Sequence, residues 1–357
     1  MPKAIPSKPR INRAQEYARG LLLAHKVATL PLDVVSIIKN TGICTLKKYS
    51  KQAIKQKVPF EYFCENFGKD GATLYKAGKR KPYTIIYNDL QRPATRIRWT
   101  LAHELGHVIL RHNEEFEETK LIRNGLTDES YKVLDDEADA FAAELLSPAI
   151  VLIAAGWTSK NDIVKHCALS NDAAKYRSKS VLGIEKVKER YFTYEYRLFK
   201  SFYNHIYINY CPECKTYFVS KEAKYCPICG ANHLIWKEGT ENIMKYPGIT
   251  VDENSKALIC PKCNNEEIIP EGKFCKICGE NLINFCEGFI DDDGNRLEEG
   301  CRKPLPGNAR FCPYCGAASH FYNRNFLESW DVSNKNTSDE EAFGSNNNLP
   351  FDEEIPF

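Results

Sequence analysis

The sequence predicts an α+β domain in its first half, followed by three small cysteine-rich modules and a disordered acidic tail. Three observations support this. Apolar residues at helical spacing surround the motif His103-Glu104-x-x-His107, and the short strand-like run Tyr83–Tyr87 precedes it. Twelve cysteines gather within residues 211–315, most of them in C-x-x-C pairs. From about Asn323 the chain is rich in Ser, Asn, Asp and Glu, a composition typical of disorder.

The composition limits the class of protein. With 357 residues the chain has room for two or three domains, and its net charge of +2 gives no global argument for nucleic acid or an acidic substrate. We expect no signal peptide, no membrane-spanning helix and a cytoplasmic location. In a reducing compartment, C-x-x-C pairs indicate metal sites rather than disulfides. Cys44, Cys64 and Cys167 stand alone and are expected to be small buried side chains.

The first half shows signals for helices and strands. We predict helices over residues 11–29 and from Pro31 to about Asn40, the second one stopped by Gly42. Strands are predicted at Ile43–Leu46 and Tyr83–Tyr87. The second of these strands is either an edge strand that aligns a peptide substrate by extending the sheet, or a plain core strand.

The central motif predicts a metal site. Histidines four residues apart lie on one face of a helix, so His103 and His107 can bind one Zn²⁺. Glu104 is turned by about 100° from His103, which suits a general base that takes a proton from the attacking water. His112 is predicted to point away from the metal. His112 and Tyr131 are the candidates for stabilising the oxyanion.

The third ligand is predicted to come from the helix within Leu134–Pro148. Its acids near the start are Asp135, Asp136, Glu137 and Asp139. Asp135 lies on the small and apolar side of the helix, whereas Glu137 shares its face with Glu144. We therefore favour Asp135 as the ligand, with Glu137 as the fallback, and expect Asp139 to accept a hydrogen bond from a ligating histidine.

Two motifs, RWTLAHELGHVILRH at residues 98–112 and EADAFAAELLSP at 137–148, resemble the ImmA/IrrE family of metallopeptidases. The resemblance covers about residues 11–185. It implies a zincin-like, gluzincin-like endopeptidase that cleaves helix-turn-helix repressors of mobile elements or stress regulons. The residues it assigns are the zinc ligands His103, His107 and Asp135 and the general base Glu104. The family often has glutamate at the third-ligand position, so the shorter Asp135 requires its helix to lie closer to the metal.

The cysteines form an internal repeat. The first two modules each contain two C-x-x-C pairs separated by eleven residues, and in the third an insertion at Glu287–Gly300 displaces the first cysteine. The Asp-Asp-Asp-Gly-Asn core of the insertion predicts a hairpin turn. Four thiolates close a tetrahedral site, so we predict three structural zinc ions in addition to the catalytic one. The predicted ligands are Cys211, Cys214, Cys226 and Cys229; Cys260, Cys263, Cys275 and Cys278; and Cys286, Cys301, Cys312 and Cys315.

The predicted organisation is a peptidase domain at 1–190, an aromatic connector at 191–210, zinc ribbons at 211–232, 260–281 and 282–320, a spacer at 233–259 and an acidic tail at 321–357. The chain ends in Ile355-Pro356-Phe357 after an acidic run, which resembles the C-terminal tip of bacterial single-stranded-DNA-binding proteins. That resemblance implies docking to DNA-repair or replication proteins. The alternative is an acidic tail without such a partner.

Three functional hypotheses follow. The leading one is a zinc-dependent endopeptidase with a protein substrate, in which the ribbons regulate or dock. The first alternative is a catalytically silent zinc-ribbon protein that binds DNA or DNA-repair or transcription proteins. The second is a stress protein that binds a repressor without cutting it. Glu104 favours the first, because a scaffold needs no carboxylate beside a metal site.

Overall fold

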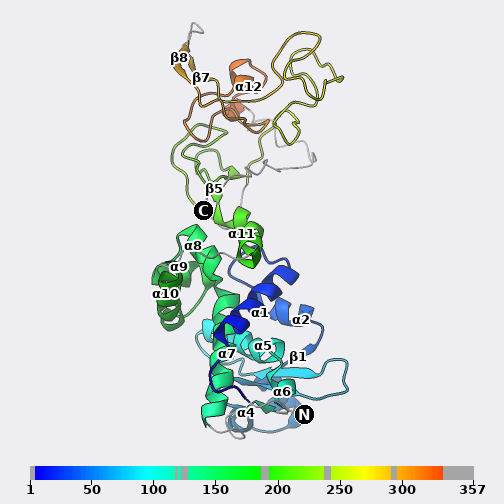
Figure 1. Ribbon diagram of the computed structural model, residues 1–357, viewed down its shortest axis with the longest axis vertical. Helices are drawn as coiled ribbons and strands as arrows, with labels where there is room; N and C mark the ends of the chain where they lie inside the picture. The colour runs from blue at the N-terminus through cyan, green and yellow to red at the C-terminus, as the bar shows by residue number, and fades with distance from the viewer. Residues whose placement is uncertain are drawn as a thin grey trace. The chain divides into compact units, whose positions relative to one another are not determined.

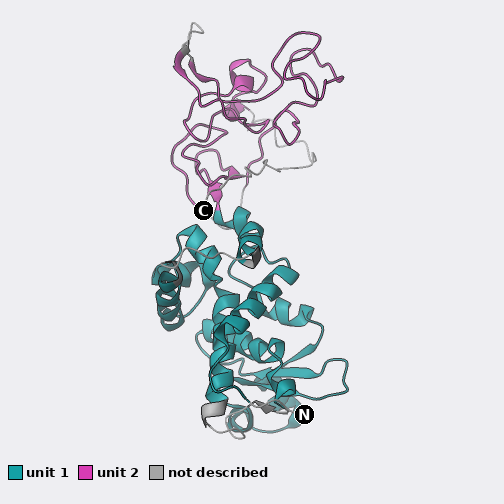
Figure 2. Cartoon of the chain, in the orientation of Figure 1, with its two compact units in different colours: residues 1–206 teal, residues 207–357 magenta. Residues whose placement is uncertain are grey.

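The computed structural model describes residues 5–116, 120–121, 128–185, 193–236, 243–290 and 296–332. The chain divides into two compact units, residues 1–206 and 207–357 (Figure 2). Most of the predicted acidic tail, including Ile355, Pro356 and Phe357, lies outside the described residues.

The first unit contains a mixed four-stranded sheet with the order β1-β3-β2-β4. Its strands are β1 (Cys44–Lys48), β2 (Gly71–Tyr75), β3 (Tyr83–Tyr87) and β4 (Lys120–Leu121). β1 runs parallel to β3, whereas β2 is antiparallel to both β3 and β4. The edge-strand interpretation of Tyr83–Tyr87 is therefore wrong. β3 is paired on both sides and is a core strand, with Ile85 and Ile86 buried.

The first unit also contains the helices of the N-terminal half of the chain, some of which pack on this sheet (Figure 1). They are α1 (Ile11–Ala24), α2 (Val34–Asn40), α3 (Tyr49–Gln56), α4 (Phe60–Phe67), α5 (Ala94–Ile109), α6 (His112–Glu115), α7 (Asp128–Leu146), α8 (Ala149–Ala155), α9 (Lys160–Cys167), α10 (Asn171–Glu185) and α11 (Thr193–Ile206). α7 packs against both α1 and α5, and α5 packs against β2 and β3. The apolar stripe of α5 that the sequence predicts is buried there, including Leu101, Leu105 and Val108.

Two helix boundaries differ from the prediction. α1 ends at Ala24 instead of continuing to residue 29. α2 begins at Val34 rather than Pro31, because the Asp33 side chain caps it by accepting hydrogen bonds from the Ser36 backbone N–H and hydroxyl at 3.1 and 2.6 Å. Gly42 follows α2 with φ +72°, a left-handed conformation that glycine adopts without a Cβ penalty.

One helical stretch, Tyr131–Ala155, is long and apolar enough to cross a membrane by length and composition alone. Our expectation that the chain has no such stretch is therefore wrong. The stretch includes most of α7 and all of α8, and 67% of its most apolar window is buried inside the protein. Such burial is typical of the core helix of a folded domain. The packing of α7 against α1 and α5 accounts for its apolar character.

The described residues of the second unit form few helices and strands. Its elements are the strand pairs β5 (Ile208–Tyr210) with β6 (Tyr217–Val219) and β7 (Gly288–Ile290) with β8 (Arg296–Glu299), and the short helix α12 (His320–Asn323). β7 and β8 lie in the predicted insertion at Glu287–Gly300, whereas the turn residues 291–295 lie outside the described residues. In the described part of the second unit, three small apolar clusters each include cysteines of one predicted metal site.

Candidate metal centres

Three ligand atoms from α5 and α7 converge in the first unit. The Nε2 atoms of His103 and His107 are 3.1 Å apart, and Oδ1 of Asp135 lies 3.1 Å from the first and 3.9 Å from the second. Tetrahedral zinc with bonds of 2.0–2.1 Å to nitrogen and oxygen needs ligand atoms about 3.3 Å apart. The donor set therefore fits such an ion. Among the described residues this group contains no fourth protein ligand, so one coordination position stays open.

Close packing of α5 on α7 brings Asp135 within reach. A Cβ atom added to Gly106 would lie only 3.2 Å from Cα and O of Ala138. A larger residue at this position would make an unusually tight contact with α7, so glycine favours the close approach of the two helix backbones. Ala138 lies three residues after Asp135 on the same side of α7, so this close approach also brings Asp135 near the two histidines of α5.

The ring of His103 is held by a second carboxylate. Its Nδ1 lies 2.8 Å from Oδ1 of Asp139, where the sequence places an acceptor. With Nε2 directed at the metal position, Nδ1 carries the proton and donates it. Burial lowers the pKa of His103, but Asp135 and Asp139 raise it well above its usual value. A metal ion must therefore displace a proton from this ring when it binds.

The ring of His107 is held from behind by His112. The two Nδ1 atoms are 2.9 Å apart, and burial lowers the pKa of His107 well below its usual value, which keeps the ring neutral. Arg111, the residue directly before α6, has φ +60°, and this left-handed turn after α5 lets α6 bring His112 back onto His107. His112 is 0% exposed, so it is neither a ligand nor a solvent-facing residue.

Glu137 completes this arrangement. Its Oε2 lies 3.1 Å from Nε2 of His112, and its two oxygens accept hydrogen bonds from the backbone N–H, Nε and Nη2 of Arg10 at 2.7–2.9 Å. Burial raises the pKa of Glu137, but His112 and Arg10 lower it to about 2, so the carboxylate stays ionised. Both nitrogens of His112 are thus engaged, which leaves it unable to stabilise an oxyanion.

The geometry also explains why Glu137, the fallback ligand, is not in the metal cluster. The face of α7 that carries Glu137 and Glu144 is buried, with side chains only 0 and 1% exposed. Each carboxylate is neutralised there by arginine, Glu137 by Arg10 and Glu144 by Arg19 and Arg177. The two acids therefore serve as buried counterions, and the exposed edge of α7 provides Asp135.

Glu104 lies in the same helix with its carboxylate held by the sheet. The Thr73 hydroxyl, on β2, donates to Oε2 of Glu104 at 2.7 Å and also lies 3.1 Å from the Glu104 carbonyl. Among the described residues, Oε1 accepts no hydrogen bond. Burial raises the pKa of Glu104 above its usual value, against the lowering effect of His103 and Thr73. Nothing in the sequence pattern indicated Thr73, because its strand was not predicted.

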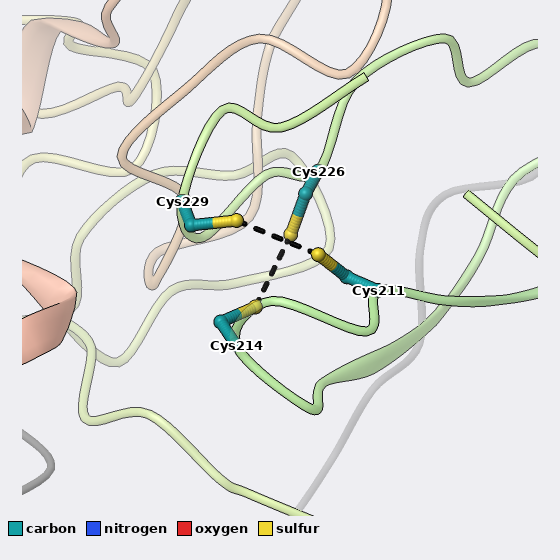
Figure 3. A group of neighbouring side chains, drawn as sticks. All are labelled: Cys211, Cys214, Cys226 and Cys229. Atoms are coloured by element: carbon teal, nitrogen blue, oxygen red, sulfur yellow. Dashed lines mark hydrogen bonds between the residues drawn. The ribbon is translucent and has the colours of Figure 1, made fainter. Parts of the chain in front are cut away.

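The second unit contains the three predicted cysteine clusters. In the first, the four sulfur atoms of Cys211, Cys214, Cys226 and Cys229 converge from two loops (Figure 3). Sγ–Sγ distances across the three clusters are 3.4–3.6 Å, which excludes disulfides. Tetrahedral zinc with 2.3 Å bonds needs about 3.8 Å. Four thiols at this spacing are consistent with a closed zinc site.

A glycine follows the second C-x-x-C pair of every module. Gly230, Gly279 and Gly316 have φ of +76°, +72° and +82°. Glycine adopts these left-handed values without a Cβ penalty, so it permits the turn after the pair. The third module contains Cys286, Cys301, Cys312 and Cys315, so the insertion does not prevent its cluster from forming.

Comparison with known proteins supports the assignment of the first unit. Residues 64–179 match the sequence model of the IrrE N-terminal-like domain, the peptidase family M78. The matched segment contains His103, His107 and Asp135. The resemblance that the two motifs indicated is confirmed over this segment. No curated protein matches the chain.

Proposed function

We propose that this chain, which carries an IrrE N-terminal-like domain of a peptidase family, is a zinc-dependent endopeptidase acting on a protein substrate. One observation carries the proposal. His103, His107 and Asp135 form a three-ligand group with an open position, and Glu104 lies on the same helix with one carboxylate oxygen available. A purely structural site would be closed by a fourth ligand and would need no such carboxylate.

The residues of the chain have separate roles in hydrolysis. Zinc in this site would supply the Lewis acidity that activates water and polarises the scissile carbonyl. Glu104 takes the proton of the attacking water on Oε1 and returns it to the leaving amine. Thr73 holds Oε2 at 2.7 Å and so fixes the direction in which Oε1 points.

The substrate reaches the site from the exposed edge of α7. The side chains of Asp135 and Asp139 are 36 and 49% exposed, whereas His107 on the opposite side is 2% exposed. Solvent and a peptide therefore have access along the edge that carries the two aspartates. The buried residues behind His107 hold its ring in position and exclude water from that side.

The substrate we propose is a helix-turn-helix repressor of a mobile element or stress regulon. This follows from the resemblance of the motifs at residues 98–112 and 137–148 to the ImmA/IrrE family. The cysteine modules would then serve as a docking or regulatory arm, because closed four-thiolate sites stabilise a fold and leave no position for catalysis.

The test is cleavage of candidate repressors by the zinc-loaded full chain. Loss of a general base lowers a rate by about 10²–10⁴-fold, so Glu104→Gln should be slower by that factor with an unchanged zinc content. Asp136→Asn is a matched control on α7 and should cleave at the wild-type rate. Cleavage by Glu104→Gln at the wild-type rate would show that Glu104 is not the base. Cleavage of unrelated peptides but of no repressor would overturn only the substrate class.

A further inference from the structure

The cysteine modules one and three are paired with each other through equivalent residues. In each module, the second C-x-x-C pair with its glycine is called the knuckle: residues 226–230, 275–279 and 312–316. The backbone N–H groups of Lys224 and Tyr225, just before the first knuckle, donate to the carbonyl of Pro313 in the third at 2.7 and 3.0 Å.

The reverse contact repeats this pattern. The N–H groups of Arg310 and Phe311, just before the third knuckle, donate to the carbonyl of Pro227 in the first at 2.8 and 3.0 Å. Pro227 occupies the same position in its knuckle as Pro313 does in its own. The two knuckles therefore meet through the same face, in the manner of a two-fold interface.

Aromatic rings complete the pairing. A Cβ atom on Gly230 would lie 3.2 Å from the ring of Phe311, and one on Gly316 would lie 3.0 Å from the ring of Tyr225. Each ring thus packs on the glycine of the opposite knuckle. Both rings are partly buried, and Phe311 also contacts the ring of Tyr322.

The middle module has the same knuckle without this pairing. Cys275 N–H donates to Glu280 O at 2.8 Å and Gly279 N–H to Cys275 O at 2.9 Å, as the equivalent groups of the first knuckle do. Yet Phe274, equivalent to Tyr225 and Phe311, is 59% exposed, and Ile277 is 67% exposed. Among the described residues, no atom lies within 4 Å of a Cβ placed on Gly279.

The backbone of this knuckle also has free donors. Within the part of the chain that the structure describes, the N–H groups of Lys273 and Phe274 have no acceptor. Their equivalents in modules one and three are the groups that donate across the paired face. The middle module therefore presents the apolar ring, the glycine and the backbone donors of a pairing face, all of them exposed.

We propose that this face pairs with the same face of a second copy of the chain. The pairing of modules one and three shows that a face of this type is complementary to another of its own type, which is what a two-fold dimer requires. Phe274 of each copy would pack on Gly279 of the other. The N–H groups of Lys273 and Phe274 would donate to the carbonyl of Lys276, which stands where the other knuckles have proline.

Lys276 does not prevent this pairing. Its ammonium group lies 2.5 Å from Oε2 of Glu267 in the same module, so its charge is compensated within each copy. A single knuckle face is small, which places the dimer in the weak and transient class of interfaces. We therefore expect dimerisation to depend on protein concentration.

The test is sedimentation velocity of the zinc-loaded full chain up to about 500 µM, a range suited to a weak interface. We expect a reversible dimer. The double variant Phe274→Glu with Ile277→Glu should raise its dissociation constant at least about 30-fold, as loss of a hot spot does. Leu297→Glu, a control at a residue that is 67% exposed on β8, should leave the constant unchanged. Lys276→Pro should keep or strengthen the dimer.

Two outcomes would overturn the proposal. One is a wild-type chain that stays monomeric over the whole concentration range, even if another protein binds the same face. The other is a dimer that survives the double variant unchanged, which would place the interface elsewhere. The metal content of every variant is measured in parallel, so that loss of the dimer is not mistaken for loss of the knuckle.

Discussion

The two units present metal ligands in opposite ways. In the first, His103, His107 and Asp135 stand on helices whose packing includes fully buried residues such as Leu105 and Phe141. In the second, the small apolar clusters contain the cysteine ligands themselves, as Cys211 and Cys226 show. We therefore expect the first fold to position its ion, whereas the second fold should be held together by its ions.

Removal of metal should produce the largest difference in stability between the two units. Structural zinc contributes about 10–16 kcal/mol to the folding of small modules, more than such modules can replace. In the full chain treated with a strong chelator, we expect backbone amides of 207–332 to lose protection from hydrogen exchange. Amides of α5 and α7 should keep theirs, although cleavage stops.

Peptide-resolved mass spectrometry of hydrogen exchange makes this comparison within one sample. Re-addition of zinc provides the control, because it should restore both protection and cleavage. Equal loss of protection in α5, α7 and the cysteine modules would contradict the contrast between the two units.

The first unit should instead depend on its buried ion pairs. Glu144 is 1% exposed and accepts hydrogen bonds from Arg177 at 2.5 Å and Arg19 at 3.0 Å. Removing one partner of a buried pair costs about 3–5 kcal/mol. Glu144→Gln should therefore lower the free energy of unfolding of the first unit by that amount, measured by hydrogen exchange of α7 and α10 in increasing urea. Asp70→Asn, which removes an exposed pair with Arg96, should cost less than about 1 kcal/mol.

The Glu144 effect should also depend on pH. Burial raises the pKa of Glu144, but Arg177 and Arg19 hold it below its usual value. The stabilisation is thus present above the unfolded pKa of about 4.3 and is lost as the pH falls through the lower folded pKa. The difference between wild type and Glu144→Gln should shrink on acidification. A difference that stays constant would show that charge is not its origin.

A smaller effect is expected behind the ligand His107. His112 accepts the Nδ1 proton of His107 across 2.9 Å and is held by Glu137. Losing such a partner weakens metal binding by about 10–100-fold. His112→Ala should therefore raise the zinc dissociation constant of this site by that factor, measured by competition with a chelator.

A conservative variant makes this prediction specific. His112→Asn retains an acceptor for Nδ1 and should recover part of the affinity. Asp139→Asn should cost less, because Asp139 is 49% exposed and water can replace it. Unchanged affinity in His112→Ala would show that His112 only fills space.

The sequence predicted the parts of this protein that depend on local spacing. Short-range patterns predicted the helix that carries His103 and His107, the strand β3 and the cysteine repeat. β2 was not predicted, because Gly71–Tyr75 has no strong alternation, and Thr73 was missed with it. Its partner Glu104 lies 31 residues away, a pairing that no local pattern contains.

The choice among the acids of α7 shows a second limit. Helix phase placed Asp135 on the small and apolar side, but its side chain is 36% exposed, whereas that of Glu137 is 0% exposed. The two acids differ because Arg10, 127 residues before Glu137, neutralises that carboxylate. A charge partner so distant in sequence becomes visible only in the folded chain.

The central claim is that the first unit binds one exchangeable ion and the second unit three tightly held ones. Metal counting on the purified full chain tests it most directly, on wild type and on the double variant His103→Ala with His107→Ala. We predict four zinc ions in wild type and three in the variant, the missing ion being the one that a mild chelator removes first. Four ions in the variant, or an ion of the first unit that resists exchange as firmly as those of the cysteine clusters, would contradict the account.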